Sequence, residues 1–307
     1  MIFLITGGAG FLGSALANRL SEDGHEVRVI DDLSTGELER LNNKVLFTRG
    51  DINDRPKLWT LLQDVECVYH LAAKVSVPQS LLYPREYNAV NVSGTVSVME
   101  AMRDAGVKRV VLASSGAVYG EQNTQPLQEG MIPNPNSPYA VSKLSAEYYV
   151  RTIGMLWGLE TVILRIFNTY GPGQPLPASH APVISKFLKC ASTGESIVMY
   201  GNGQQTRDFV YIDDVIDALT ASSTAKTIRQ NVINIGSGTA SNLNHLVNTI
   251  GTILQMQLDP IYNNNESGGV KEMCADIREA QTTLKYEPRI SLESGIQRTI
   301  DLDKRFK

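Results

Sequence analysis

The sequence predicts an α/β fold, a doubly wound parallel β-sheet with a smaller C-terminal α/β lobe. Short apolar runs alternate with helical patterns through the first half of the chain, which is typical of a parallel sheet covered by helices on both faces. The runs lie at Ile2 to Thr6, Glu26 to Ile30, Val45 to Thr48, Cys67 to His70, Val110 to Ala113 and Thr161 to Leu164. After Asn168 this rhythm breaks at a loop rich in glycine and proline, from Tyr170 to Pro177.

The break places a boundary near residue 170. We expect a first domain over residues 1–169 and a lobe over residues 170–307, which mixes helices, short strands and glycine-rich turns. An apolar run from Asn231 to Ile235 resembles a sheet strand, so some late segments are expected to return to the first sheet.

The composition is that of an ordinary globular protein, with 42% hydrophobic and 20% charged residues. The net charge of −4 comes from intermixed acids and bases. Nucleic acid or an anionic membrane would require a cluster of Lys and Arg, so we expect neither as a partner.

The three cysteines, Cys67, Cys190 and Cys274, are far apart and lack metal-ligand spacing, and the four histidines are equally scattered. We therefore expect reduced thiols and no metal site. The apolar N-terminal run has no basic leader and passes directly into glycines, which predicts a strand instead of a signal peptide. No run approaches the ~18 apolar residues of a membrane helix, so the expected location is the cytoplasm.

The first predicted strand leads into a glycine-rich turn, Thr6-Gly7-Gly8-Ala9-Gly10-Phe11-Leu12-Gly13, and then into a helical pattern. Glycines at 7, 10 and 13 let the backbone approach a pyrophosphate, while the helix N-terminus offers N–H groups to its phosphates. The glycines alone could mark a structural turn. The strand before them and the helix after them favour a dinucleotide site in a Rossmann-type domain.

The second predicted strand ends at Asp31-Asp32, 18 residues after Gly13. An acid in this place can hydrogen-bond the ribose hydroxyls of NAD, and its charge would repel the 2′-phosphate of NADP. The position therefore predicts NAD as the cofactor, with Asp31 the stronger candidate of the two acids.

A helix is predicted to start at Ser137-Pro138, which places Tyr139 and Lys143 four residues apart on one of its faces. An ammonium beside a phenol favours the phenolate, so we expect a lowered pKa for Tyr139 and a role as a base. The spacing alone is weak evidence. Ser114-Ser115 supports it, because these serines end an apolar strand whose carboxyl end should face a ligand.

Further segments accompany these motifs, and all of them fall in order along the chain. They are His70-Leu71-Ala72-Ala73, Asn91, Val118-Tyr119-Gly120, Leu164-Arg165-Ile166-Phe167-Asn168, Tyr170-Gly171-Pro172 and Arg207-Asp208-Phe209-Val210-Tyr211. With them the chain resembles the NAD-dependent epimerase/dehydratase family of extended short-chain dehydrogenases over nearly its whole length. It is most similar to the UDP-glucose 4-epimerase branch.

The resemblance implies a role for each matching residue. The catalytic residues would be Ser115, Tyr139 and Lys143. NAD would be bound by Gly7, Gly10, Phe11, Leu12, Gly13, Asp31, Asp32, Ser34, Gly36, Asp51, Ile52, Leu71, Ala72, Ala73, Asn91, Ser114, Tyr139, Lys143 and Phe167. A nucleotide-diphosphate sugar, expected to be a UDP-hexose, would be held by Ser76, Ser115, Asn168, Val198, Tyr200 and Arg207. Taken singly, several have a structural alternative, such as strand core for Val198 and Tyr200 or a surface ion pair for Arg207.

One segment departs from the family pattern. Between Asn263 and Asp276, related epimerases usually carry an Arg and a Gly-Asp toward the diphosphate and ribose, but here Glu266 and Gly269 take those places. An acid facing a diphosphate would weaken binding unless Lys271 moves in or the loop points elsewhere. The nucleotide and the sugar therefore stay open.

The resemblance implies 4-epimerisation through a transient 4-keto sugar. Related 4,6-dehydratases and decarboxylases carry acids after the catalytic hydroxyl residue, whereas this chain has Gly116 and Ala117. Eliminating water needs an acid and a base beyond the tyrosine, so oxidation and reduction at one carbon is the expected chemistry.

Alternatives remain. A 4-keto sugar reductase and a 2-epimerase are rivals within the family, and a non-catalytic NAD-sensing protein is a rival of another class. The resemblance also implies a homodimer, paired through helices around Tyr87 to Arg103 and Tyr139 to Met155.

Overall fold

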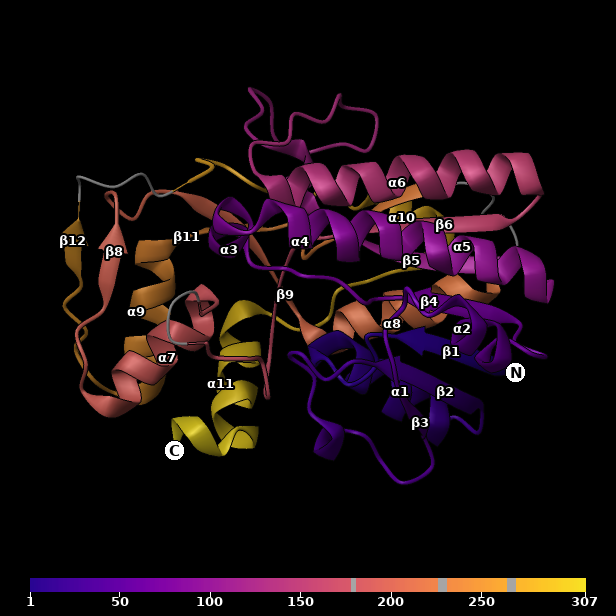
Figure 1. Ribbon diagram of the computed structural model, residues 1–307. Helices are drawn as coiled ribbons and strands as arrows, with labels where there is room; N and C mark the ends of the chain where they lie inside the picture. Colours follow the sequence, from indigo (N-terminus) through magenta and orange to yellow (C-terminus); the bar gives the residue numbers. More distant parts are fainter. Residues whose placement is uncertain (178–180, 226–230, 264–268) are drawn as a thin grey trace.

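The computed structural model describes residues 1–177, 181–225, 231–263 and 269–307, and a seven-stranded parallel sheet lies at its centre (Figure 1). The strands follow the order β10-β6-β5-β4-β1-β2-β3. Their bounds are β1 Ile2–Thr6, β2 Glu26–Asp31, β3 Leu46–Arg49, β4 Cys67–His70, β5 Arg109–Ser115, β6 Glu160–Ile166 and β10 Asn231–Ile235. The order confirms the predicted doubly wound sheet and puts its switch point between β1 and β4.

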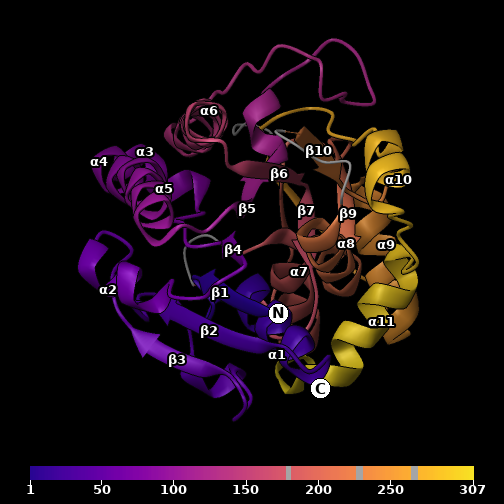
Figure 2. The ribbon, with the colours of Figure 1, turned by 90° about the vertical axis from the view of Figure 1, so that its right-hand side faces the viewer.

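Helices cover both faces of this sheet (Figure 2). One face carries α2 Arg55–Leu61, α5 Gly94–Ala105 and α6 Pro138–Trp157, and the other carries α1 Phe11–Glu22, α8 Ile212–Thr224 and α10 Arg278–Leu284. Alternate side chains of each strand enter opposite layers. Phe3 and Ile5 pack in one core with Leu16 of α1, whereas Leu4 packs in the other with Leu58 of α2. Burial on both faces explains the continuous apolar runs of the sequence.

Two smaller sheets, with the helices that pack beside them, lie to one side of the central sheet (Figure 1). Strands β7 Asn168–Tyr170, β9 Thr206–Tyr211 and β11 Ala240–Asn242 form one sheet, and β8 Val198–Tyr200 pairs in parallel with β12 Ile261–Asn263. Helix α9 Leu243–Leu254 packs between α7 Val183–Thr193 and α11 Leu292–Leu302. Three late segments lie with the central sheet instead, since α8 packs on β5, β10 pairs with β6 and α10 packs on β10.

Short helical segments pack against α6. They are α3 Val77–Leu82 and α4 Pro84–Asn88, which both contact α6, and a π-helical turn over Ala89–Ser93 that leads into α5. Within the described ranges, no helix has the length and apolar character needed to cross a membrane.

Candidate functional site

The turn between β1 and α1 presents bare backbone at the carboxyl edge of the sheet. Gly7 has a φ of +68°, in the left-handed region that favours glycine. A Cβ on Gly13 would lie 2.1 Å from the carbonyl oxygen of Gly7, so a larger residue cannot be accommodated. Gly10 is the N-cap of α1 and gives it no side-chain cap, and Phe11 and Leu12 form the first helical turn. The helix start therefore offers its N–H groups to a ligand phosphate.

Asp31 ends β2 beside this turn. Its Oδ2 accepts a hydrogen bond from the backbone N–H of Ala9 at 3.0 Å, and its Oδ1 accepts one from that of Leu33 at 2.8 Å. Burial raises the pKa of Asp31, and the two backbone donors oppose that rise. The carboxylate is thus fixed at the place where a ribose would lie.

The other residues predicted around the adenosine half lie on neighbouring loops. A Cβ on Gly36 would lie 2.9 Å from Oδ1 of Asp31, so this loop folds closely over the carboxylate. Asp32 is exposed and accepts a hydrogen bond from the backbone of Ser34 at 2.8 Å. After β3, Asp51 is exposed and Ile52 is buried in the core with α2 and α5.

The segment after β4 is tied to the same turn. The backbone N–H of Leu71 donates to the carbonyl of Thr6 at 3.1 Å, and that of Ala72 donates to the Thr6 hydroxyl at 3.2 Å. A Cβ on Gly7 would lie 2.7 Å from the backbone of Ala72. The ends of β1 and β4, with Ala73 next in the chain, therefore form one backbone surface at the switch point.

Asn91 connects this segment with α6. Its side chain is 2% exposed; Oδ1 accepts from the N–H of Lys74 at 2.8 Å, and Nδ2 donates to the carbonyl of Lys74 and to Oγ of Ser142, both at 2.9 Å. Because its amide is engaged within the protein, Asn91 holds the Lys74 backbone against α6.

Tyr139 and Lys143 lie on the buried face of α6 against the end of β5. Ser137 caps this helix, as predicted. The Lys143 ammonium donates to the carbonyl of Ala113 at 2.8 Å, and the Ser115 hydroxyl at the end of β5 lies near enough to Tyr139 to act on its pKa. The structure therefore brings together the three residues that the sequence predicts to be catalytic.

The electrostatics of this group differ from the sequence-based expectation. Burial raises the pKa of Tyr139, and the nearby Ser115 hydroxyl opposes this rise. Burial also lowers the pKa of Lys143 to about 8, and the charge of Glu147 opposes that fall. The predicted lowering of the Tyr139 pKa is not observed, because desolvation of the phenol dominates and the ammonium donates to a backbone carbonyl.

Tyr87, on α4, is a buried neighbour of Tyr139 to which the motifs assign no role. The two rings meet edge to face with centroids 6.4 Å apart. The Tyr87 hydroxyl donates to the carbonyl of Ser76 at 2.6 Å, and Ser76 is the N-cap of α3. Tyr87 thus fixes a predicted substrate residue relative to Tyr139, and nothing in the local sequence indicates this contact.

Glu147 and Arg165 were also given no role by the motifs. Glu147 lies one turn beyond Lys143 on α6, and both of its carboxylate oxygens accept hydrogen bonds from Arg165 of β6. The repeated spacing of four from Tyr139 through Lys143 to Glu147 is the signal that could have identified it.

Phe167 lies against the turn that follows Ser115. A Cβ on Gly116 would lie 3.2 Å from the Phe167 ring, and the ring of Tyr119 has its centroid 6.4 Å from that of Phe167. Neither Gly116 nor Ala117 provides an ionisable group in this turn.

Four residues predicted to hold a nucleotide sugar lie on the smaller sheets. Asn168 begins β7 and is paired with Phe209 of β9, two residues after Arg207. Val198 is half-buried and Tyr200 is exposed, at the two ends of β8. The structure therefore places Asn168 near Arg207, whereas Val198 and Tyr200 belong to a separate two-stranded sheet.

Arg207 lies beside the segment that departs from the family pattern. Its guanidinium donates to the carbonyl of Val270 at 2.7 Å, and a Cβ on Gly269 would lie 3.7 Å from its Nη2. Burial lowers the pKa of Arg207, and the charge of Glu121 opposes this. Glu266, expected in the Arg position, lies outside the described residues.

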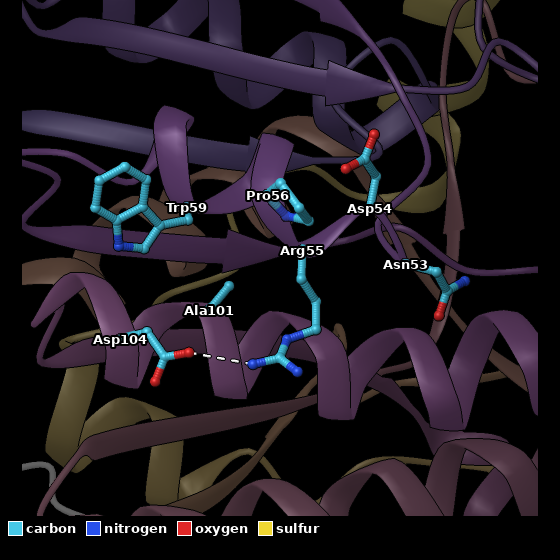
Figure 3. A pocket seen from close by; sticks show the side chains of 7 residues that line it. All are labelled: Asn53, Asp54, Arg55, Pro56, Trp59, Ala101 and Asp104. Atoms are coloured by element: carbon cyan, nitrogen blue, oxygen red, sulfur yellow. Dashed lines mark hydrogen bonds and ion pairs between the residues drawn. The ribbon is translucent and has the colours of Figure 1, made fainter.

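A surface depression of about 640 Å³ lies apart from these groups, between α2 and α5 (Figure 3). The Arg55 guanidinium is paired there with Asp104 at 3.1 Å and with Glu100 at 3.2 Å. None of the predicted site residues lines it; the lining consists of Asn53, Asp54, Arg55, Pro56, Trp59, Ala101 and Asp104.

The carboxyl edge of the sheet has the features that a dinucleotide cofactor needs. Bare backbone faces the pyrophosphate position, an uncapped helix start supplies N–H groups, and a fixed carboxylate ends β2. Among the residues that the structure describes, no three His, Cys, Asp or Glu side chains are grouped as a metal site.

Known proteins resemble this chain along nearly its whole length. A putative UDP-glucose 4-epimerase from Methanocaldococcus jannaschii is 37% identical over 302 residues, which cover 98% of this chain and 97% of that protein. The structure of UDP-glucose 4-epimerase with UDP-glucose from Thermotoga maritima matches with a TM-score of 0.94 and 35% identity, covering 98% of each chain. UDP-N-acetylglucosamine 4-epimerase from Methanobrevibacter ruminantium, in complex with UDP-N-acetylmuramic acid, matches at 0.93 and 35%, covering 98% of this chain and 97% of that one.

The family model described as the NAD dependent epimerase/dehydratase family matches residues 3–236. This match confirms the resemblance found in the sequence, and the cofactor of the family is NAD, as Asp31 predicted. The chain belongs to the NAD-dependent epimerase/dehydratase family.

Proposed function

We propose that the protein is a nucleotide-sugar 4-epimerase that acts on UDP-glucose and UDP-galactose, or on their N-acetyl or uronic acid relatives. The observation that carries the proposal is the grouping of Ser115, Tyr139 and Lys143 at the end of β5. Support comes from relatives named as 4-epimerases of UDP-glucose and UDP-N-acetylglucosamine, at 35% identity across almost the full chain.

NAD would be held mainly by backbone. Its pyrophosphate would lie on the glycine turn and the start of α1, and its adenosine ribose on Asp31. The segment after β4 and Phe167 would border the nicotinamide half. When bound, oxidised NAD supplies a hydride acceptor and a positive charge.

Tyr139 would move the proton of the sugar C4 hydroxyl, with the nearby Ser115 hydroxyl as the relay. Burial leaves Tyr139 a weak acid, so a positive charge nearby is needed to stabilise its phenolate. The Lys143 ammonium, one turn along the same helix, would supply part of that charge.

The turn after Ser115 supports epimerisation over elimination. A dehydratase needs a second acid and base beside the sugar, but Gly116 and Ala117 carry none, and the Phe167 ring fills the space in front of Gly116. A single proton-moving group suits oxidation and reduction at one carbon.

The nucleotide sugar would be bound largely by the lobe over residues 170–307. Arg207 would face the diphosphate, with Asn168, Val198 and Tyr200 around the nucleotide, and Ser76 and Ser115 would face the sugar.

The outer face of α6 carries exposed Tyr148 and Met155, which would pair with a second copy of the chain in a homodimer. A monomer in sedimentation at micromolar concentration would count against this pairing.

Nuclear magnetic resonance of the sugar pool tests the proposed reaction. The purified protein should interconvert UDP-glucose and UDP-galactose, or a related pair, without net consumption of NAD. Tyr139→Phe should lose about 100- to 10,000-fold in kcat, because it removes the proton-moving group. Tyr149→Phe, at an exposed position of the same helix, should keep its activity. A stable 4-keto-6-deoxy product, or NADH released in proportion to substrate, would overturn the assignment.

A further inference from the structure

A buried ion pair lies behind the proposed catalytic group. Glu147 of α6 is 1% exposed and Arg165 of β6 is 3% exposed. The Arg165 guanidinium donates to both carboxylate oxygens, with Nη2 to Oε2 at 2.7 Å and Nε to Oε1 at 3.0 Å. The guanidinium also stacks over the Tyr119 ring, 4.7 Å from its centroid. Burial opposes its charge, yet the hydrogen bonds and charge of Glu147 prevail and raise the pKa of Arg165.

The same carboxylate holds Ser114. The Ser114 hydroxyl donates to Oε1 of Glu147, and Ser114 pairs in register with Arg165 across β5 and β6. Ser114 is the residue before Ser115, so its hydrogen bond fixes the end of β5 where Ser115 meets Tyr139.

Glu147 also acts on Lys143, one helical turn away. Lys143 is buried, which lowers its pKa to about 8, and Glu147 is the group that opposes this loss of charge. Arg165, which Glu147 pairs with, is charged, whereas His70 and Tyr139 are uncharged near neutral pH. Burial and the charge of Lys143 lower the pKa of His70, at the end of β4, to about 3, and burial raises the pKa of Tyr139.

An ion pair that served stability alone could be replaced by apolar side chains at little cost. Here the carboxylate has three partners of different kinds: Arg165 as its anchor, Ser114 as a donor and Lys143 as a charge. The pairing with Arg165 explains why a charged carboxylate is tolerated in the interior. Ser114 and Lys143 connect this carboxylate with the proposed catalytic group, since Ser114 precedes Ser115 and Lys143 belongs to the group.

We propose that Glu147 is a positioning residue, whose carboxylate, anchored by Arg165, fixes the Ser114 end of β5 and keeps Lys143 in its ammonium form beside Tyr139. The proposal rests on the proposed function for the role of Tyr139. It predicts that Lys143 loses its proton at a lower pH when the charge of Glu147 is removed. At alkaline pH the Tyr139 phenolate would then no longer be stabilised by the Lys143 ammonium.

The test is the pKa of Lys143 in Glu147→Gln, measured by nuclear magnetic resonance of ¹³C-labelled lysine with Lys143→Arg for assignment. The variant should titrate about one pH unit lower than the wild type. The alkaline limb of its profile of kcat/KM against pH should shift to lower pH by the same amount. Glu147→Asp, which keeps the charge, should restore the position of both.

Two controls separate this role from stability. Asp214→Asn removes another buried carboxylate, one that accepts from the backbone of Arg289 and Ile290, and it should lower the melting temperature without moving the Lys143 titration. If Glu147→Gln alone does not fold, the double variant with Arg165→Gln leaves no unpaired buried charge and should shift Lys143 in the same direction.

An unchanged Lys143 pKa in folded Glu147→Gln or in the double variant overturns the inference. A loss of rate in which neither limb of the kcat/KM profile against pH shifts overturns it as well. The lysine titration does not depend on turnover. Absence of epimerase activity in the wild type would therefore refute the proposed function separately from the role of Glu147.

Discussion

The cofactor side and the substrate side of this site are built in different ways. On the cofactor side, neighbouring residues and backbone groups form the surface, as in the contact of Gly7 with Gly13 and the bond from Leu33 to Asp31. On the substrate side, Arg207 is held by the carbonyl of Val270, which is 63 residues away. Local sequence therefore fixes the glycine turn at the centre of the first surface, whereas the surface around Arg207 depends on how distant segments pack.

The largest effect is expected from Gly13→Ala on the cofactor side. The new Cβ would lie 2.1 Å from the carbonyl oxygen of Gly7, so the turn must open and the N–H groups of α1 must move. We expect NAD affinity, measured by calorimetry on stripped protein, to fall at least about 100-fold, since the pyrophosphate is proposed to lie on this one turn.

Gly130→Ala is the matched control, because no atom lies within 4 Å of the added carbon. It should bind NAD as the wild type does. Retained affinity in folded Gly13→Ala would show that the turn is more tolerant than the geometry indicates, and the contrast between the two sides would weaken.

This difference explains what could be predicted from the sequence. The strand, turn and helix around Gly7, the acid at Asp31 and the cap at Ser137 depend on residues within a few positions, so their patterns predicted them. The seven-stranded sheet followed from the alternation of such local units.

Properties set by burial were not predictable in this way. The Tyr139 pKa moved opposite to the expectation, because its desolvation depends on the neighbours that fold around it. The pairing of Glu147 with Arg165 joins a helix to a strand, and neither residue carries a mark of that partnership in its own segment. The segment that faces Arg207 is equally non-local.

A smaller effect is expected from Arg207→Met on the substrate side. Methionine keeps the apolar stem but removes the guanidinium proposed to face the diphosphate, and a charged hydrogen bond contributes about 1.5 to 3 kcal/mol. We expect UDP-sugar affinity to fall roughly 10- to 100-fold in calorimetry, with NAD affinity unchanged.

Arg298→Met serves as its control, because Arg298 is half-exposed, is paired with Asp213 at 3.8 Å and has no proposed role in binding the nucleotide sugar. Should Arg207→Met bind the nucleotide sugar normally, the diphosphate must lie elsewhere. A joint loss of NAD and sugar binding would show instead that the two sides are not independent.

The smallest effect is expected from Asp31→Asn, which tests whether one carboxylate sets the choice of cofactor. Its two oxygens are held by the N–H groups of Ala9 and Leu33, so the charge stays at the ribose position. Removing that charge should improve NADP affinity relative to NAD about tenfold, or ~1.4 kcal/mol. Asp32→Asn should leave the ratio unchanged, since Asp32 is exposed and turned to Ser34.

The pH dependence sharpens this last prediction. Burial raises the pKa of Asp31, so in the wild type the carboxylate takes up a proton at a higher pH than an exposed aspartate, and its repulsion of a 2′-phosphate fades as the pH falls. The preference for NAD should therefore decline on acidification. Asp31→Asn lacks this carboxylate but keeps the other titrating groups, including the phosphate of NADP, so the difference between the two proteins isolates the carboxylate. A wild-type preference that follows the same pH curve as Asp31→Asn would place discrimination in the shape of the loop around Gly36 instead of in the charge of Asp31.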